Sequence, residues 1–239
     1  MPLSAVFLIP PPALKDVSSS NILGHLALKF GATPLHDTPT HTPFTLKHEL
    51  SVTTSSLLPG QASTRGYMQV LQLSASADIH YIGITQPNEP ISLATVPTSG
   101  IEMYKAMMQA KMQALWRNRH TLTVTDGQAV RLKVPAGPIE LRVGDLRADN
   151  NVFQGVLLEV TRTHTEGIPD EYSQADEALI QELARRLLEG LPISLDEEGV
   201  GSHLCYTETI VEPHPRHINQ DKKTRALGLA EAYMEVLRK

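Results

Sequence analysis

Repeated alternation of apolar and polar residues is the feature that most restricts the fold of this chain. In the clearest run, Phe44, Leu46, His48, Leu50 and Val52 alternate with polar residues. A period of two is typical of a β-strand with one buried face. Segments of this kind fall into two groups of about four, with short turns inside each group. Short turns imply antiparallel pairing, so the sequence predicts a large antiparallel sheet.

The other predicted strands are bounded by turn residues, and the last of them is long. They cover Leu3–Ile9, Tyr67–Leu73, Tyr81–Thr85, Ile91–Val96, Thr121–Thr125, Val130–Val134, Ile139–Val143 and Val152–Thr163. We expect Asp126-Gly127 to form a tight turn between two of them. Gly144 predicts a bulge or sharp bend.

Helical spacing appears before and between the strand groups. The polar residues Ser18 to Asn21 offer caps for a helix that Gly31 ends. In the middle of the chain, Ser99-Gly100-Ile101-Glu102 has the pattern of a capping box. That helix should reach Asn118 and pass straight into a strand, because no Gly or Pro intervenes. Trp116 and His120 are therefore the predicted structural junction.

The C-terminal part carries two more helical patterns. Ser173 precedes one that contains Leu183 and Leu187 and stops before Gly190. We expect residues 191–221 to form a long loop, and 224–238 to form a final helix. We therefore divide the chain into a domain of residues 1–190 and an extension of residues 191–239. The fold class is α+β: an antiparallel β-barrel-like sheet flanked by helices, with an additional C-terminal helix.

Composition excludes several classes of protein. The formal net charge is −5, which argues against direct nucleic-acid binding. The single cysteine, Cys205, excludes an internal disulfide and a multi-cysteine zinc site. We find no credible targeting segment, and no apolar run approaches the roughly 20 residues of a membrane span.

Residues that carry chemistry do not form a convincing constellation. His36 and His41 lie in a Pro-rich segment, and His214 and His217 have no partners at known zinc spacing. Cys205 lacks an obvious pre-organised base. We therefore predict no catalytic residue, no cofactor and no metal.

Two groups of residues keep a second interpretation open. The methionines of the central helix, which include Met103 and Met107, are core residues or a groove for a partner. The arginines and lysines between Arg117 and Arg147 lie on solvated strand faces, or form a patch for an acidic partner or nucleic acid.

Several segments, taken in order, resemble the Mediator complex subunit 20 family. The first is Tyr67–Ser74, and the second is Trp116–Val124 with Gly127-Gln128. Leu141–Leu146 and Gly155–Val160 resemble the family's closing strand pair, and Ala178–Leu188 resembles a terminal helix. The resemblance covers residues 1–190. Residues 129–138 and the tail after residue 190 depart from the pattern.

The resemblance implies a nuclear, non-enzymatic subunit of the Mediator head module. A member of this family forms a heterodimer with Mediator subunit 18 and contacts subunit 8 and other head subunits. It acts as a coactivator and reaches the RNA polymerase II machinery indirectly, with no membrane contact. We expect the partner interface to include one strand face and one helix face, formed by Met103, Met107, Val156, Leu158 and Val160.

The main alternative is a small-molecule-binding or hydrolytic β-barrel enzyme. Such a protein needs a pocket lined by convergent polar groups. His48, His120 and Asp145 are the residues that would line it. This hypothesis requires the three side chains to lie close together.

Overall fold

The computed structural model describes residues 3–14, 17–35, 43–53, 65–87, 89–134, 137–162, 182–191, 193, 201–205 and 217–238. The strands are β1 (Leu3–Ile9), β2 (Thr33–Pro34), β3 (Phe44–Thr53), β4 (Tyr67–Leu73), β5 (Ile79–Thr85), β6 (Ser92–Pro97), β7 (Trp116–Val134), β8 (Gly137–Ala148), β9 (Phe153–Arg162) and β10 (Gly201–Cys205). The helices are α1 (Pro11–Leu14), α2 (Ser19–Phe30), α3 (Ile101–Met112) and α5 (His217–Leu237), with 3-10 turns η1 (Ser74–Ser76) and η2 (Thr98–Gly100). Residues 182–188 are also helical.

The described strands form one sheet of ten strands. Their order is β10-β1-β9-β8-β7-β3-β4-β5-β6, and β2 lies against β7. Every pairing is antiparallel. This confirms the predicted α+β class and the antiparallel sheet.

The strand β7 connects the two halves of the sheet, because its first part pairs with β3 and its second part with β8. The predicted turn at Asp126-Gly127 is wrong, since β7 continues through it. Phe44 lies opposite Gly127 whereas Leu46 lies opposite Val124, so β7 has one extra residue here. An extra residue forms a bulge, which bends the strand and curves the sheet.

Gly127 and Gly144 allow the strands to approach closely at this bend. A Cβ atom at Gly127 would lie 2.6 Å from the Phe44 ring, and one at Gly144 would overlap Val124. Gly144 itself keeps an unbroken register with β9. The bulge predicted at Gly144 therefore lies on the neighbouring strand β7.

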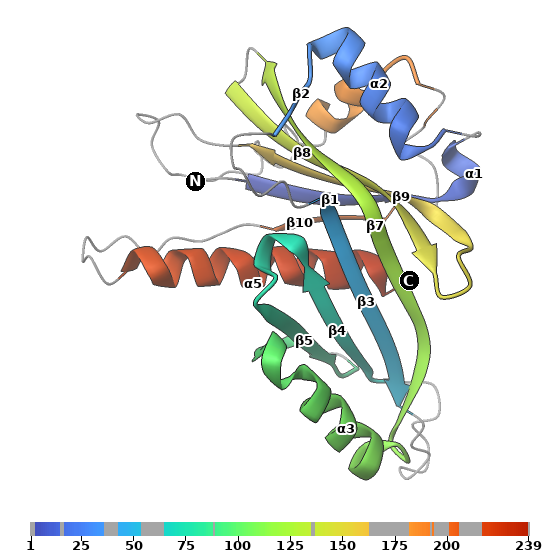
Figure 1. Cartoon of the computed structure of the whole chain (residues 1–239), viewed down its shortest axis with the longest axis vertical. Helices are drawn as coiled ribbons and strands as arrows, with labels where there is room; N and C mark the ends of the chain where they lie inside the picture. The colour runs from blue at the N-terminus through green and yellow to red at the C-terminus, as the bar shows by residue number, and fades with distance from the viewer. Residues whose placement is uncertain are drawn as a thin grey trace.

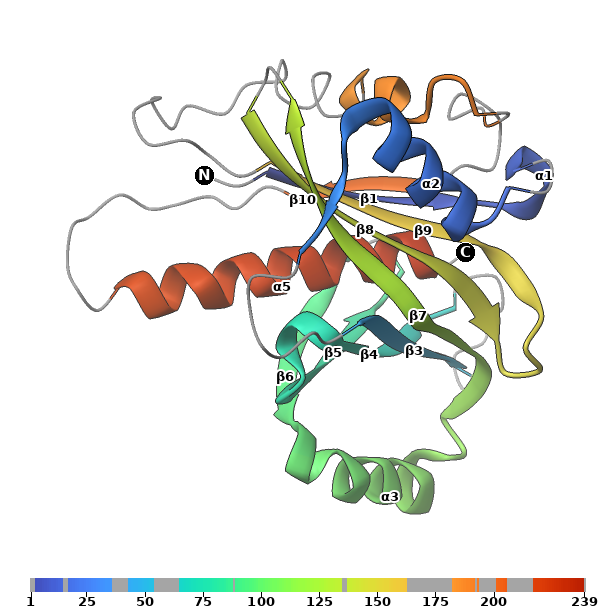
Figure 2. The same ribbon diagram turned by 45° about the horizontal axis from the view of Figure 1, so that its top comes forward.

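The curved sheet encloses α5. Figures 1 and 2 show α5 between the half formed by β1, β8 and β9 and the half formed by β3, β4 and β5. We call the sheet face toward α5 the inner face and the opposite one the outer face. In Figure 2, α2 lies outside the first half and α3 outside the second.

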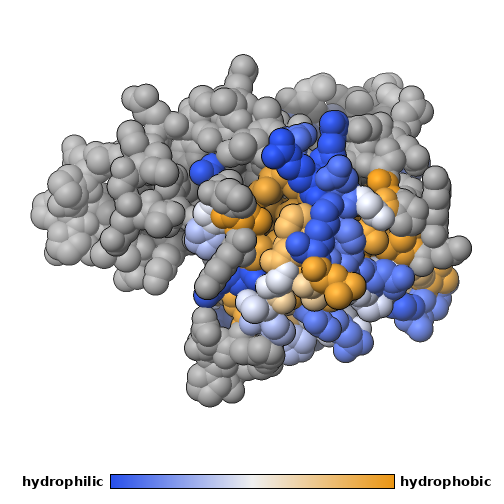
Figure 3. Space-filling model, turned by 90° about the horizontal axis from the view of Figure 1, so that it is seen from above, coloured by the Kyte–Doolittle hydropathy of each residue, from blue (hydrophilic) through white to orange (hydrophobic). Residues whose placement is uncertain are grey.

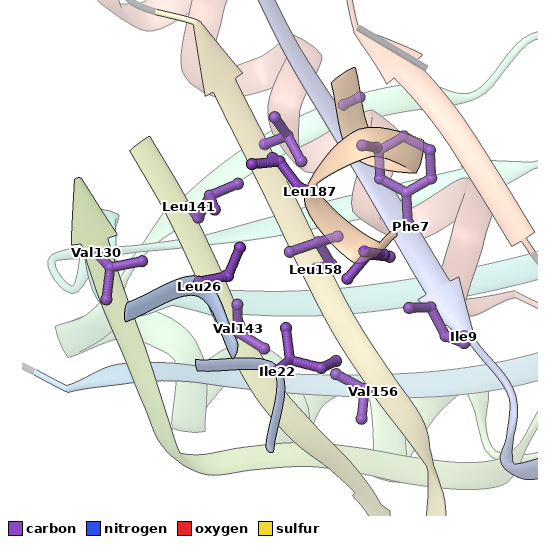
Figure 4. Packing of buried hydrophobic residues seen from close by; sticks show 14 of the residues in the cluster. Phe7, Ile9, Ile22, Leu26, Val130, Leu141, Val143, Val156, Leu158 and Leu187 are labelled. Atoms are coloured by element: carbon purple, nitrogen blue, oxygen red, sulfur yellow. The ribbon is translucent and has the colours of Figure 1, made fainter. Parts of the chain in front are cut away.

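A cluster of buried apolar residues lies between the outer face and α2. Ile22 and Leu26 of α2 reach toward Val143, Val156 and Leu158 of β8 and β9 (Figure 4). Leu187, from the helical residues 182–188, completes the cover. Burying side chains of this size contributes about 1.5–3 kcal/mol each.

The inner face has its own cluster, which includes α5. Tyr233, Met234 and Leu237 of the helix pack against residues such as Leu71 and Leu157. A smaller third cluster lies under α3, on the outer face of β4 and β5.

The central helix is shorter than predicted. It ends at Met112 rather than near Asn118, and three turn residues separate it from β7. The capping box does not form, because Ser99 belongs to η2 and Gly100 occupies the N-cap position without a side-chain hydrogen bond. Trp116 is the first residue of β7 and packs, half-buried, against the third cluster.

The region after residue 190 contributes to the same sheet and core. The predicted loop of residues 191–221 is wrong, since it contains β10, which pairs with β1, and the start of α5 at His217. The division of the chain at residue 190 stays a prediction. The predicted start of the third helix, residues 173–181, lies outside the described residues.

The surface on the α2 side is mixed in polarity. Seen from above the view of Figure 1, hydrophilic residues form a band between smaller hydrophobic areas (Figure 3). Leu28 of α2 is 91% exposed, but the neighbouring Leu26 points into the core.

Candidate functional site

The exposed face of α3 carries the most prominent solvent-facing methionines. Met103 is 79% exposed and Met107 is 50% exposed. They are four positions apart, which places them on one side of the helix. Tyr104 and Met108 point the other way, toward the third cluster. α3 therefore has one apolar face against the sheet and a second that faces solvent.

The strand residues of the predicted interface lie elsewhere. Val156, Leu158 and Val160 are each at most 1% exposed, under α2 and the helical residues 182–188. They face the core of this chain rather than solvent. Of the five predicted interface residues, only Met103 and Met107 are accessible, and the interface itself stays a prediction.

Two histidines lie near each other on the inner face. His48 of β3 is fully buried and its Nε2 lies 2.9 Å from Oε1 of Gln69 on β4. The ring of His120, on β7, has its centroid 6.3 Å from that of His48. Burial lowers the pKa of His48 to about 4, although the Gln69 bond opposes this. His48 is therefore neutral at pH 7.

Asp145 does not join these histidines. Its Oδ1 accepts a 2.9 Å hydrogen bond from the backbone N–H of Ser19, at the start of α2 on the outer face. His120 instead lies on the inner face, where it borders a cavity together with Leu237 of α5. The structure therefore does not bring together the three residues that the enzyme hypothesis requires.

A buried ionic cluster centres on Glu159 of β9, which is 2% exposed. Its carboxylate accepts a 2.6 Å hydrogen bond from the hydroxyl of Tyr233 in α5. It also accepts bonds from the guanidinium of Arg142 on β8 and from Thr161, 3.2 Å away. Thr161 in turn bonds Ser4 of β1 at 2.9 Å. The cluster connects three strands to α5.

The environment of Arg142 favours the charged form of its guanidinium. The negative charge of Glu159 raises the pKa of Arg142. Burial is the next largest effect and acts in the opposite direction, but the pKa is raised overall. A cavity of about 320 Å³ borders Arg142, Glu159 and Tyr81. Removing one partner of a buried pair is strongly destabilising, whereas the pair itself adds little net stability. The cluster therefore specifies where α5 docks more than it strengthens the fold.

Three basic residues of the central segment lie close to carboxylates of neighbouring residues. Arg131 pairs with Glu140 at 3.0 Å, and Arg142 pairs with Glu159. Arg147 lies 3.8 Å from Asp145. Neighbouring carboxylates thus compensate three of the cations that suggested contact with nucleic acid.

The described residues contain no group of three or more His, Cys, Asp or Glu side chains placed to hold a metal ion. His36, His41 and His214 lie outside the described residues. Within the described helices, none has both the length and the apolar content to cross a membrane.

Reasoning from sequence missed Glu159, Gln69 and Tyr233. Glu159 did carry a signal, because it is the one charged residue inside the apolar run Val156–Val160. A charge in such a run is nearly always paired when buried. Its partners could not be inferred, since Tyr233 is 74 residues away.

The fold defines the class of protein: a curved antiparallel sheet that encloses its own C-terminal helix. Residues 36–238 match the family model described as "TATA-binding related factor (TRF) of subunit 20 of Mediator complex". The chain belongs to the Mediator subunit 20 family, a component of a transcription-regulatory complex. The match runs through residue 238, so the tail that looked like a departure lies within the family's pattern.

Two further comparisons add little. No curated protein matches the chain. A solved structure described as "Structure of PH1819 protein from Pyrococcus Horikoshii OT3" has 7% identity and a TM-score of 0.38, and the alignment covers 81% of this chain and 92% of that one. A similarity at this level carries no argument about fold or function.

Proposed function

We propose that this chain is a non-enzymatic subunit of the Mediator head module that acts as a transcription coactivator in the nucleus. It forms a heterodimer with Mediator subunit 18, contacts subunit 8 and other head subunits, and reaches RNA polymerase II through them. The observation that carries the proposal is the family match over residues 36–238.

The geometry of the polar residues supports a structural role. The carboxylate of Glu159 accepts hydrogen bonds from Arg142, Tyr233 and Thr161. The carboxylate of Asp145 accepts one from the backbone at the start of α2. A general acid or base needs a titratable group within reach of a substrate. In the described part of the chain, these carboxylates bond to the protein's own framework. They are therefore better suited to stabilise a fixed shape than to catalyse a reaction.

The heterodimer is tested by co-expression with affinity-tagged Mediator subunit 18, followed by size-exclusion chromatography. We expect the two chains to elute together in a 1:1 ratio. In cells, the chain should accumulate in the nucleus and co-purify with subunit 8. A chain that elutes alone and does not co-purify with any Mediator subunit would refute the proposal.

The interface is tested at the exposed face of α3. Charged side chains at two exposed methionines should prevent close apolar contact, so Met103→Glu with Met107→Glu should raise the Kd for subunit 18 at least about tenfold. Leu28→Glu is the matched control, because Leu28 is more exposed than either methionine but lies on α2. Equal binding by the double variant and the wild type would show that the interface does not include this face of α3.

A further inference from the structure

The strand β6 is the last strand at one edge of the sheet. Within the described residues, it pairs only with β5. An edge strand exposes a row of backbone N–H and C=O groups to which another strand can bind. β6 has six residues, an ordinary length for a strand, and its pairing with β5 is regular throughout. The edge is therefore long and regular enough to accept a further strand.

Two observations show which backbone groups of β6 point away from β5. In an antiparallel pair, opposite residues alternate between those that exchange both backbone hydrogen bonds and those that exchange none. Thr98, just after β6, donates its N–H to the carbonyl of Asp78 at 2.9 Å, and the register continues to these two residues. Pro97 lies opposite Ile79 and has no N–H, which fits a position that exchanges no bond.

The alternation assigns the direction of each residue in β6. Counting back by twos from the bonded position, Val96 and Ala94 bond to β5. Leu93 and Thr95 therefore direct their N–H and C=O groups to the free edge, where Pro97 adds a carbonyl. In the part of the chain that the structure describes, no backbone hydrogen bond reaches these outward groups.

β6 lacks the features by which edge strands usually avoid contact with other chains. Such strands carry charged side chains, a bulge, or a proline that interrupts the edge. β6 has no charged residue, its register has no shift, and its proline, Pro97, is the last residue. An unprotected edge of this kind favours aggregation unless another strand covers it. This property indicates an edge that is covered in a complex.

The side chains of β6 define the kind of strand that fits. Leu93 packs at the margin of the cluster on the inner face, and Val96 packs at the margin of the third cluster under α3. The side chains of an added strand would lie beside these residues, on both faces of the sheet. A matching segment is therefore uncharged, with apolar or small side chains on both faces.

The edge of β6 adjoins the exposed face of α3. A stable interface buries about 800 Å² on each partner, so the contact must extend beyond one strand edge. α3 follows β6 directly through η2, and its first turn carries the exposed Met103. Figure 2 shows β6 leading into the start of α3. The strand edge and the methionine face can therefore contact the same partner.

We propose that β6 receives an extended, uncharged segment of the protein partner, which adds a strand to this edge of the sheet. This inference rests on the proposed function, because it takes Mediator subunit 18 as the partner. The added strand accepts hydrogen bonds from the N–H groups of Leu93 and Thr95 and donates to their carbonyl groups. In contacts of this kind, backbone bonds give affinity and alternate side chains give specificity.

Amide hydrogen exchange, measured residue by residue by NMR, tests the proposal on the wild-type chain, free and in complex with subunit 18. In the free chain, the N–H groups of Ala94 and Val96 should exchange slowly, because they bond to β5, and those of Leu93 and Thr95 should exchange fast. In the complex, Leu93 and Thr95 should exchange at least about tenfold more slowly. This alternating pattern distinguishes an added strand from a partner that only covers one face.

A proline substitution tests the same contact by affinity. Thr95→Pro removes one outward N–H and leaves the hydrogen bonds to β5 in place, as Pro97 does two residues later. It should raise the Kd for subunit 18 at least about tenfold. Thr95→Val is the matched control, because it keeps the N–H group and should bind like the wild type. The exchange measurement needs no variant, so it decides the question even if Thr95→Pro fails to fold.

The outcomes separate this inference from the proposed function. A complex with subunit 18 in which Leu93 and Thr95 still exchange fast, or which Thr95→Pro forms with unchanged affinity, overturns the strand addition alone. Failure to form any complex overturns the proposed function and this inference with it. Slow exchange of both outward N–H groups in the free chain would show that the edge is already covered, by this chain or by a second copy, and would also overturn the proposal.

Discussion

The hydroxyl of Tyr233 donates a 2.6 Å hydrogen bond to the buried carboxylate of Glu159, and thereby joins the C-terminal helix to a central strand of the sheet. Both side chains are almost completely inaccessible to solvent. The bond explains how an apolar helix face acquires a defined position along an apolar groove. A slide of α5 by one residue would leave Glu159 without this donor.

Tyr233→Phe should lower the free energy of unfolding by about 1–3 kcal/mol, because a buried charged acceptor loses a donor. Urea denaturation followed by circular dichroism measures this change. Tyr104→Phe is the matched control: its hydroxyl contacts only the sulfur of Met68, at 3.4 Å, and it is partly exposed. Equal effects of the two substitutions would contradict the role given to the Tyr233–Glu159 bond.

Arg142→Met should destabilise the protein by about 3–5 kcal/mol, because it leaves the Glu159 charge buried without its cation. Arg186→Met provides the comparison, since Arg186 pairs with Glu182 at the surface and such pairs contribute about 0–1 kcal/mol. Thermal unfolding of the two variants separates the two cases.

Asp145→Ala should cost about 0.5–2 kcal/mol, because Asp145 accepts the hydrogen bond from Ser19 at the start of α2. Asp145→Asn keeps an acceptor and should lose less. Ser18→Ala should change little, since Ser18 holds the N-cap position without a side-chain capping bond. If Ser18→Ala proves the more harmful substitution, the local sequence rather than Asp145 caps the helix.

Gly144→Ala should destabilise the protein by about 1–3 kcal/mol or prevent folding, because the new methyl group would overlap Val124 of β7. Gly24→Ala should stabilise it by about 0.5–1 kcal/mol. Gly24 lies within α2, and a methyl group there meets no atom within 4 Å. Denaturation midpoints of the two variants should therefore move in opposite directions.

Lys105→Met should lower the stability of the protein at neutral pH and reduce the part of that stability that is lost in acid. Burial would raise the pKa of Glu49, but bonds to Lys105 and Lys47 outweigh it, so the pKa is lowered overall. A lowered carboxylate pKa contributes stability above the unfolded value of 4.5, which is lost as the pH falls below it. Stability curves from pH 7 to 3 should show a smaller acid-dependent loss in the variant. An unchanged curve would show that Glu49 gains nothing from Lys105.

Patterns within one segment predicted local structure well. Tyr67–Leu73 became β4 with the predicted bounds, and Gly31 ends α2 in the left-handed conformation at φ 61°. In both cases the determining interactions lie within a few residues, so the sequence contains them directly.

Interactions between distant segments account for the failures. Asp126-Gly127 is a residue pair typical of tight turns. However, β7 pairs with β3 on one side and β8 on the other, so it stays extended through these residues. The extra residue of β7 forms a bulge. The cap of α2 comes from Asp145, 126 residues from Ser19. β10 was missed because its partner β1 lies about 200 residues away, so no local alternation revealed the pairing.

The candidate site was predictable only in part. The exposure of Met103 and Met107 agrees with a partner groove, which helical spacing alone could not separate from core packing. Sequence reasoning placed His48 and His120 on apolar faces, where they do lie. The contact of His48 with Gln69, and the cavity that His120 shares with Leu237, depend on strand order and on where α5 docks, and neither can be predicted from periodicity.

The position of β1 between β9 and β10 sets the order in which this protein can be completed on the ribosome. Leu3–Ile9 is synthesised early, yet both neighbouring strands are made more than 140 residues later. At about 5–20 residues per second, this apolar segment stays without its partners for several seconds or longer. The sheet can therefore close around β1 only after the chain has been made through β9 and β10.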